Sequence, residues 1–156
     1  MDNNSPDLGP KSPEPDSTIP VKVLIVEDDP SFKLMISAVF ENDPYITFAV
    51  CTKGEKALEL LRVAKKEKTP FDLVISDLGL PGMNGFELAR VVREELLAGR
   101  FTLFTGSDVL SNNTREQLVE KGIDNVLKKP DLVVPFLNEI RQTRILKQGQ
   151  SENPQT

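Results

Sequence analysis

The sequence predicts an α/β protein in which five parallel strands alternate with five helices to form a doubly wound sheet. Short apolar runs alternate along the chain with segments whose apolar residues recur at helical spacing, a pattern typical of parallel strands joined by crossover helices. Several of the apolar runs end directly in charged residues. Doubly wound sheets place their functional sites at the carboxyl ends of the strands, so these charged residues are expected to share a site.

Five short runs rich in β-branched or aromatic residues are the predicted strands. They are residues 22–26, 46–50, 73–76, 101–105 and 125–127. The first run leads into Glu27 and Asp28, the third into Asp77, and the fifth into Lys128 and Lys129.

Stripes of apolar residues at helical spacing predict the helices that connect the strands. These stripes are Phe32, Met35, Ile36, Val39 and Phe40; Ala57, Leu58, Leu61 and Ala64; Phe86, Ala89, Val92 and Leu96; and Leu132, Val133, Phe136, Leu137 and Ile140. Pro135 is expected in the first turn of the last helix, where proline is tolerated. A further helix over 114–121 has few apolar residues and is expected to be exposed, with Gly122 as its cap.

The two ends of the chain differ in composition from the part between them. Residues 1–20 are rich in proline and polar residues, which predicts a disordered tail. Residues 147–156 are also polar and are expected to form a flexible tail. The predicted folded domain therefore spans 21–146.

Composition excludes several classes of protein. The length of 156 residues fits one domain, and the net charge of -5 argues against a nucleic-acid surface. A single cysteine cannot form an internal disulfide, and no apolar stretch is long enough to cross a membrane. The polar amino terminus does not resemble a signal peptide, so a cytoplasmic location is expected.

The chain contains no histidine, which removes histidine general bases, Ser-His and Cys-His nucleophile pairs, and histidine-bound zinc. The remaining chemistry belongs to carboxylates, lysines and hydroxyl groups. Asp77 ends an apolar run and precedes Gly79, Pro81 and Gly82, so a turn is expected to present its carboxylate. Asp77 could instead be a simple turn or helix cap.

Three carboxylates brought together repel one another unless a cation neutralises them or one of them stays protonated. Glu27, Asp28 and Asp77 therefore predict a Mg²⁺ site, since this ion prefers oxygen ligands. A carboxylate beside such an ion can attack phosphorus and form an aspartyl phosphate. Thr105 and Lys129 could then stabilise the charge on the transferring oxygens.

The chain resembles the receiver domains of two-component response regulators. The resemblance rests on VLIVEDD at 23–29, KGEKAL at 53–58, DLGLPGMNG at 77–85, LFTG at 103–106 and LKKP at 127–130. These motifs occur in the family's order and cover the whole predicted domain. The resemblance implies a flavodoxin-like sheet with strand order 2-1-3-4-5.

The resemblance also implies a role for each matching residue. Asp77 would accept a phosphoryl group from a histidine kinase or a phosphotransfer protein. Asp28 would bind Mg²⁺ directly and Glu27 through water, while the carbonyl of Gly79 would be a further ligand. Thr105 and Lys129 would contact the phosphoryl group, and the Lys129-Pro130 bond is expected to be cis. Asp29 is expected to cap the helix that begins near Pro30.

Three positions depart from the common family pattern. Val126 replaces the Tyr or Phe that many members carry three residues before the lysine, so the output is expected to rely on movement of loops and helices and not on an aromatic side chain. Gly79 and Ser107, two residues beyond Asp77 and Thr105, are small. Our hypothesis is that these small residues set the lifetime of the phosphorylated form.

The leading functional hypothesis is a stand-alone receiver that catalyses only its own phosphorylation and dephosphorylation. It would signal through protein contacts on the face formed by the fourth predicted helix, the fifth strand and the last helix. One alternative is a pseudo-receiver that binds partners without phosphate. A second is an aspartyl-phosphate phosphatase similar to the haloacid dehalogenases, but their Asp-x-Asp motif is interrupted here by Gly79.

Overall fold

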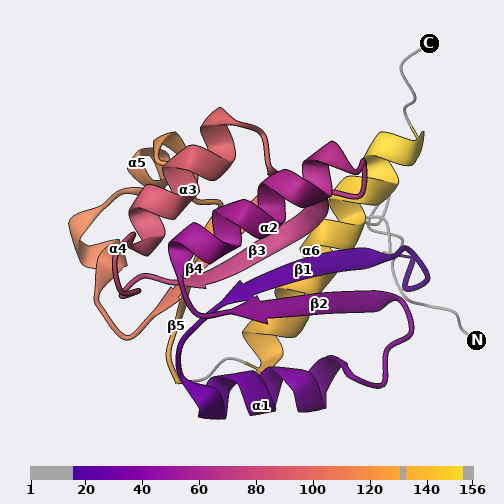
Figure 1. Cartoon of the computed structure of the whole chain (residues 1–156), viewed down its shortest axis with the longest axis horizontal. Coiled ribbons are helices and arrows are strands. Elements are labelled where there is room, and N and C mark those ends of the chain that lie inside the picture. The colour runs from indigo at the N-terminus through magenta and orange to yellow at the C-terminus, as the bar shows by residue number, and fades with distance from the viewer. Residues whose placement is uncertain (1–15, 131–132, 153–156) are drawn as a thin grey trace, which may run out of the picture.

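A computed structural model describes residues 16–130 and 133–152 of the chain. Strands and helices alternate along most of this length (Figure 1). The elements are β1 (Val21–Val26), α1 (Pro30–Phe40), β2 (Ile46–Cys51), α2 (Gly54–Lys66), β3 (Phe71–Asp77), α3 (Gly85–Glu94), β4 (Ala98–Thr105), α4 (Val109–Asn112), α5 (Arg115–Glu120), β5 (Asn125–Lys128) and α6 (Val133–Glu152).

The five strands form one parallel sheet in the order β2-β1-β3-β4-β5, which confirms the predicted fold class and strand order. Helices α2 and α3 cover one face of the sheet, and α1 and α6 cover the other (Figure 1). The strand order reverses between β1 and β3. The carboxyl ends of these two strands therefore border the crevice where such folds bind ligands.

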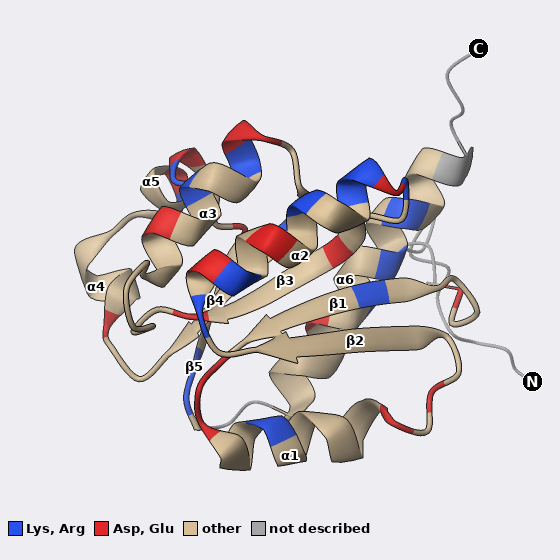
Figure 2. Ribbon diagram, in the orientation of Figure 1, with Lys and Arg blue, Asp and Glu red and all other residues tan. Residues whose placement is uncertain are grey.

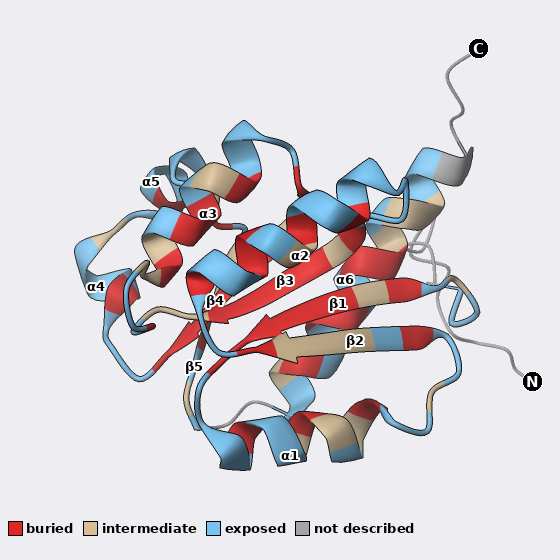
Figure 3. Cartoon of the chain, in the orientation of Figure 1, coloured by how far each residue is buried: buried red, intermediate tan, exposed pale blue. Residues whose placement is uncertain are grey.

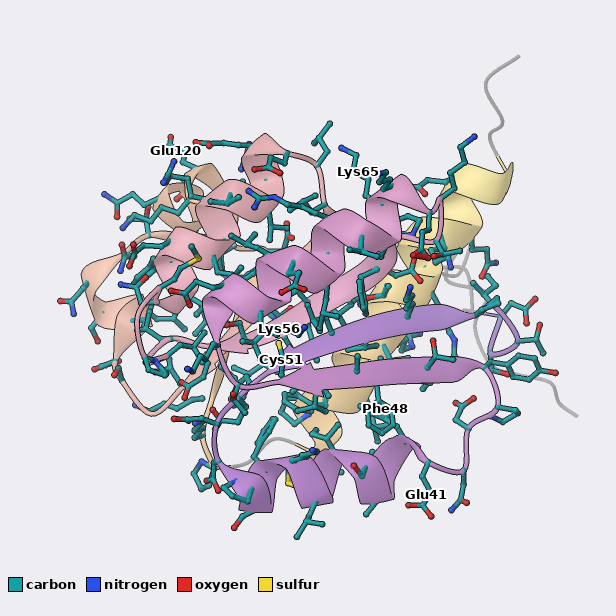
Figure 4. The ribbon with its side chains drawn as sticks, viewed as in Figure 1. Glu41, Phe48, Cys51, Lys56, Lys65 and Glu120 are labelled. Carbon is teal, nitrogen blue, oxygen red and sulfur yellow. The ribbon has the colours of Figure 1, made fainter. Side chains whose placement is uncertain are left out.

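The sheet separates two apolar clusters. Leu24 packs with the side chains of α2 and α3, whereas its neighbour Ile25 packs with those of α1 and α6, as the alternation of a strand requires. Strands β1 and β3 are buried along most of their length (Figure 3). At the edge of the sheet, Cys51 and Phe48 of β2 point to opposite faces (Figure 4).

Local signals at the helix ends behave as predicted. Asp29 is the N-cap of α1, and its side chain accepts a hydrogen bond from the backbone N–H of Ser31 at 2.9 Å. Helix α5 begins after Thr114, close to the predicted start, and Gly122 follows it with a φ of 89°. Pro135 lies in the first turn of α6.

The described residues form six helices rather than the predicted five, because the short helix α4 precedes α5. The apolar stripe of α3 is also corrected. Leu96 was expected to face the core, but it is 75% exposed, whereas Leu97 is 2% exposed. The helix ends at Glu94 and the chain reverses, with Leu96 at a φ of 54°, so the next residue turns inward.

Helix α6 continues to Glu152, beyond the end predicted near residue 146. Residues 16–20, the described part of the predicted amino-terminal tail, lie against this extension. Arg144 Nε donates a hydrogen bond to the carbonyl of Ile19 at 3.1 Å, and Lys147 Nζ donates to the carbonyl of Pro20 and to the Asp72 carboxylate. These contacts tie the carboxyl-terminal half of α6 to the residues just before β1 and to β3.

Only part of the predicted stripe of α6 reaches the core. Phe136 and Ile140 are buried, whereas Val133 and Leu137 are exposed, and Leu132 lies outside the described residues. None of the helices in the described ranges is long and apolar enough to cross a bilayer.

Candidate functional site

Three carboxylates meet at the carboxyl ends of β1 and β3. Val26 pairs with Ser76 in the sheet, so the residues that follow, Glu27 and Asp77, emerge side by side. One oxygen from each of Glu27, Asp28 and Asp77 lies within 4.8 Å of the others. Figure 2 shows acidic residues in red where β1 leads into α1, and basic residues in blue on β5.

Lys129 joins two of these carboxylates. Its Nζ atom donates to Glu27 Oε1 at 3.0 Å and to Asp77 Oδ2 at 3.3 Å, and it lies 4.8 Å from the centre of the Phe104 ring. Glu27 is buried, whereas the Asp77 side chain is 14% exposed. Asp77 is therefore the member of this pair that an incoming group can reach.

Burial and crowding shift the titration of the site. Burial, together with the adjacent Asp77 carboxyl, raises the pKa of Glu27 to about 7, although Lys129 opposes this shift. Burial would lower the pKa of Lys129, but the hydrogen bond to Glu27 and the charge of Asp77 outweigh it, and the pKa of Lys129 is raised. Lysine 129 is therefore a fixed positive charge in contact with two acids.

Thr105 ends β4 on the same edge of the sheet and is buried. Its hydroxyl oxygen accepts a hydrogen bond from the backbone N–H of Ser107 at 3.0 Å, and its carbonyl accepts one from the backbone N–H of Lys129 at 3.0 Å. The ends of β4 and β5 are thus tied together through Thr105 and Lys129. The Lys129-Pro130 bond is cis, as the resemblance implied.

Two glycines near the site, Gly79 after β3 and Gly106 after β4, leave room for a larger side chain. The backbone N–H of Gly79 lies 3.4 Å from Asp77 Oδ1. A Cβ atom added at Gly79 or at Gly106 would meet no other atom within 4 Å. The structure therefore leaves open space beside Asp77 and beside Thr105.

The contacts bring Glu27, Asp28, Asp77 and Lys129 together directly. Thr105 joins them through its backbone, and Gly79 through its N–H group. All the residues predicted for the site thus lie at the carboxyl ends of the strands.

Other residues that support the site were not predicted. Phe104, under Lys129, stacks on Phe32 at 4.3 Å between ring centroids. Asn84 and Glu87 form a capping box at the start of α3, in the loop that follows Asp77. The spacing of an Asn three residues before a Glu could have indicated this box, but nothing local marks the ring of Phe104 as part of the site.

The donor set fits a hard divalent cation. Glu27, Asp28 and Asp77 supply carboxylate oxygens, the ligands that Mg²⁺ prefers. Burial first, and then the hydrogen bond and repulsion of the adjacent Asp77 carboxyl, raise the pKa of Glu27. A cation would relieve this repulsion.

Comparisons with known proteins identify relatives of this chain. A family model described as the response regulator receiver domain matches residues 23–134. The nitrate/nitrite response regulator protein NarL of Escherichia coli is 32% identical over 114 residues, which cover 70% of this chain and 48% of NarL. The DNA-binding response regulator MtrA of Mycolicibacterium smegmatis is 34% identical over 113 residues, which cover 72% of this chain and 46% of MtrA. The chain spans about half the length of these curated relatives.

Among solved structures, the chemotaxis response regulator CheY4 of Vibrio cholerae matches with a TM-score of 0.64 and 26% sequence identity. This match covers 80% of the present chain and 98% of CheY4.

Proposed function

The chain belongs to the response regulator receiver domain family, and from this premise we propose that Asp77 accepts a phosphoryl group from a histidine kinase or a phosphotransfer protein. One observation carries the proposal: the partly exposed carboxylate of Asp77 lies against Glu27, Asp28 and the ammonium of Lys129. A nucleophile, an acidic metal pocket and a fixed positive charge are the parts that phosphoryl transfer requires.

The proposed transfer exchanges one bond to phosphorus for another. A carboxylate oxygen of Asp77 attacks the phosphorus of a phosphohistidine, forming an O–P bond as the N–P bond breaks, and the donor imidazole nitrogen takes up a proton. These 156 residues contain no histidine, so the donor histidine lies outside them. Lys129 neutralises charge on the phosphoryl oxygens, and the Thr105 hydroxyl donates a hydrogen bond to one of them.

Glu27, Asp28 and Asp77 would hold Mg²⁺, with the carbonyl of Gly79 as a further ligand. The bound ion would screen the negative charges of acceptor and donor from each other. Glu27 and Asp28 would hold the ion's positive charge beside Asp77 before the donor arrives.

Signalling would then proceed through contacts with a downstream protein. The fourth predicted helix, the fifth strand and the last predicted helix correspond to α5, β5 and α6. Exposed apolar side chains lie on these helices, namely Val119, Val133, Val134 and Leu137. Exposed apolar groups on a charged protein favour docking of a partner.

Acetyl phosphate tests this proposal without the unknown kinase. The protein is incubated with acetyl phosphate and Mg²⁺, and its intact mass is measured. We expect a gain of one phosphoryl group that is absent in Asp77→Asn and is lost when Mg²⁺ is chelated. Asp29→Asn is the matched control, because it removes a neighbouring carboxylate outside the cluster and keeps a capping side chain.

No adduct on the wild-type protein, together with no spectral change on adding the phosphate mimic beryllofluoride, would overturn the proposal. That result would favour the phosphorylation-independent receiver. Slow release of phosphate from many added small-molecule phosphate esters would favour the phosphatase instead.

A further inference from the structure

A buried carboxylate on α6 lies away from the acidic cluster. Glu139 is 2% exposed. Its Oε1 atom accepts hydrogen bonds from Arg100 Nε at 2.9 Å and from the hydroxyl of Thr102, and its Oε2 atom accepts one from Asn125 Nδ2 at 2.7 Å. The donors come from β4 and β5, so one helical side chain joins α6 to two strands.

An apolar residue would be the simpler occupant of this position. Removing a carboxylate from water is costly unless it is paired and hydrogen-bonded. Burial disfavours ionisation of Glu139, but Arg100, Thr102 and Asn125 outweigh it and lower the pKa of Glu139. The group is therefore a charged anchor with a defined geometry, and the apolar contacts of Phe136 and Ile140 on the same helix have no such directionality.

The strand partners of Glu139 lead directly to the phosphorylation site. Thr102 and Asn125 are paired across β4 and β5. Three residues further along β4 lies Thr105, which pairs with Lys128 and accepts the backbone hydrogen bond of Lys129. Extended strands are stiff over such a distance, about 10 Å for three residues. A shift of either strand end is thus expected to reach Glu139.

We infer that Glu139 couples the phosphorylation site to α6, so that the Arg100, Thr102 and Asn125 contacts carry the state of Asp77 to the exposed face of this helix. The inference rests on the proposed function and concerns the regulation of its partner surface. Val126 has no aromatic ring that could couple the phosphorylation site to the surface. In this inference the buried cluster around Glu139 provides that coupling instead.

The driving force is electrostatic. Phosphorylation would replace the single negative charge of the Asp77 carboxylate with a phosphoryl group that carries about 1.5 to 2 negative charges and three strong acceptor oxygens. Lys129, now shared between Glu27 and Asp77, would turn toward the phosphoryl oxygens, and the Thr105 hydroxyl would leave the N–H of Ser107 to bind them. Both strand ends would then move, and the Glu139 anchor would move α6 with its exposed Val134 and Leu137.

Conservative variants remove the hydrogen bonds from β4 and from β5 to Glu139 separately. Thr102→Val removes the hydroxyl donor on β4, and Asn125→Val removes the amide donor on β5, and both replacements suit a strand. Thr143→Val is the matched control. Its hydroxyl is also buried but donates to the backbone carbonyl of Glu139 within α6, not to a strand.

Hydrogen exchange measured by mass spectrometry reports the coupling. Each protein is compared with and without acetyl phosphate and Mg²⁺, and the adduct on Asp77 is quantified in the same samples. We expect the wild type and Thr143→Val to change the exchange rate of α6 on phosphorylation. Thr102→Val and Asn125→Val should form the adduct but lose this change.

The outcomes separate the two proposals. Absence of the adduct on the wild type overturns both of them. An adduct with no response of α6 in the wild type, or a response that persists in Thr102→Val and Asn125→Val, overturns only the coupling. Loss of the response in Thr143→Val as well would show a general effect of loosened packing and would also overturn it.

Discussion

At the scale of single residues, the backbone that presents Asp77 depends on one of its neighbouring glycines and not on another. A Cβ on Gly85 would lie 2.7 Å from the carbonyl oxygen of Asp77 and 2.9 Å from Leu103 Cδ2. We expect Gly85→Ala to lower the free energy of unfolding by about 1–3 kcal/mol through overpacking. Gly79→Ala, whose Cβ meets no atom within 4 Å, should leave it unchanged. Urea unfolding checks both, and equal losses would contradict the expectation.

The open space at Gly79 also bears on the lifetime of the phosphorylated form. A side chain at Gly79 would enter open space two residues from Asp77, and Ser107, two residues from Thr105, is exposed. We expect the aspartyl phosphate at Asp77 to be hydrolysed faster in Gly79→Asn and in Ser107→Glu than in the wild type, because an amide or carboxylate can orient the attacking water. The decay of the intact-mass adduct measures this rate, with Gly79→Ala as control. Unchanged rates would show that these positions do not set the lifetime.

At the scale of the elements, α6 contributes one buried ring to the support of the site. Phe136 is fully buried and contacts Phe104 with 5.7 Å between ring centroids, whereas the adjacent Leu137 is 47% exposed. We expect Phe136→Ala to lower the free energy of unfolding by about 3–5 kcal/mol. Leu137→Ala should change it by no more than about 0.5 kcal/mol. Similar losses of unfolding free energy in the two variants would contradict the placement of α6 with Phe136 buried and Leu137 exposed.

At the scale of the whole molecule, the buried cluster at Glu139 links stability to pH. The pKa of Glu139 is lowered in the folded protein. The unfolded chain therefore binds the proton more readily, and the free energy of unfolding rises with pH. This contribution is complete above the ordinary glutamate pKa of about 4.3 and is lost as the pH falls through the lower folded value.

Thermal unfolding between neutral and acidic pH tests this linkage. The melting temperature of the wild type should fall more steeply below the ordinary glutamate pKa than that of Glu139→Gln, which carries no titrating group at this position. Glu94→Gln, a change at an exposed glutamate, controls for the loss of one carboxylate. Parallel acid curves for the wild type and Glu139→Gln would refute the expectation.

The sequence by itself determined the alternation of strands and helices, the strand ends and the helix cap at Asp29. These features depend on neighbouring residues: an apolar run stops where Glu27 or Asp77 begins, and a short polar side chain bonds the next turn. The strand order and the roles of the motif residues came from the family resemblance. The strand order is confirmed, and the roles of the motif residues remain predictions.

Only the tertiary structure decided which distant side chains meet. Lys129 reaches Glu27 across 102 positions of the chain, and Arg100 reaches Glu139 across 39. Leu96 and Leu97 are chemically the same, yet the reversal after α3 exposes one and buries the other. In the sequence, nothing distinguishes Glu139 from the other charged residues of an amphipathic helix. Its significance comes from three donors that β4 and β5 bring to it, because pairing between strands is set by the packing of the whole sheet and not by local sequence.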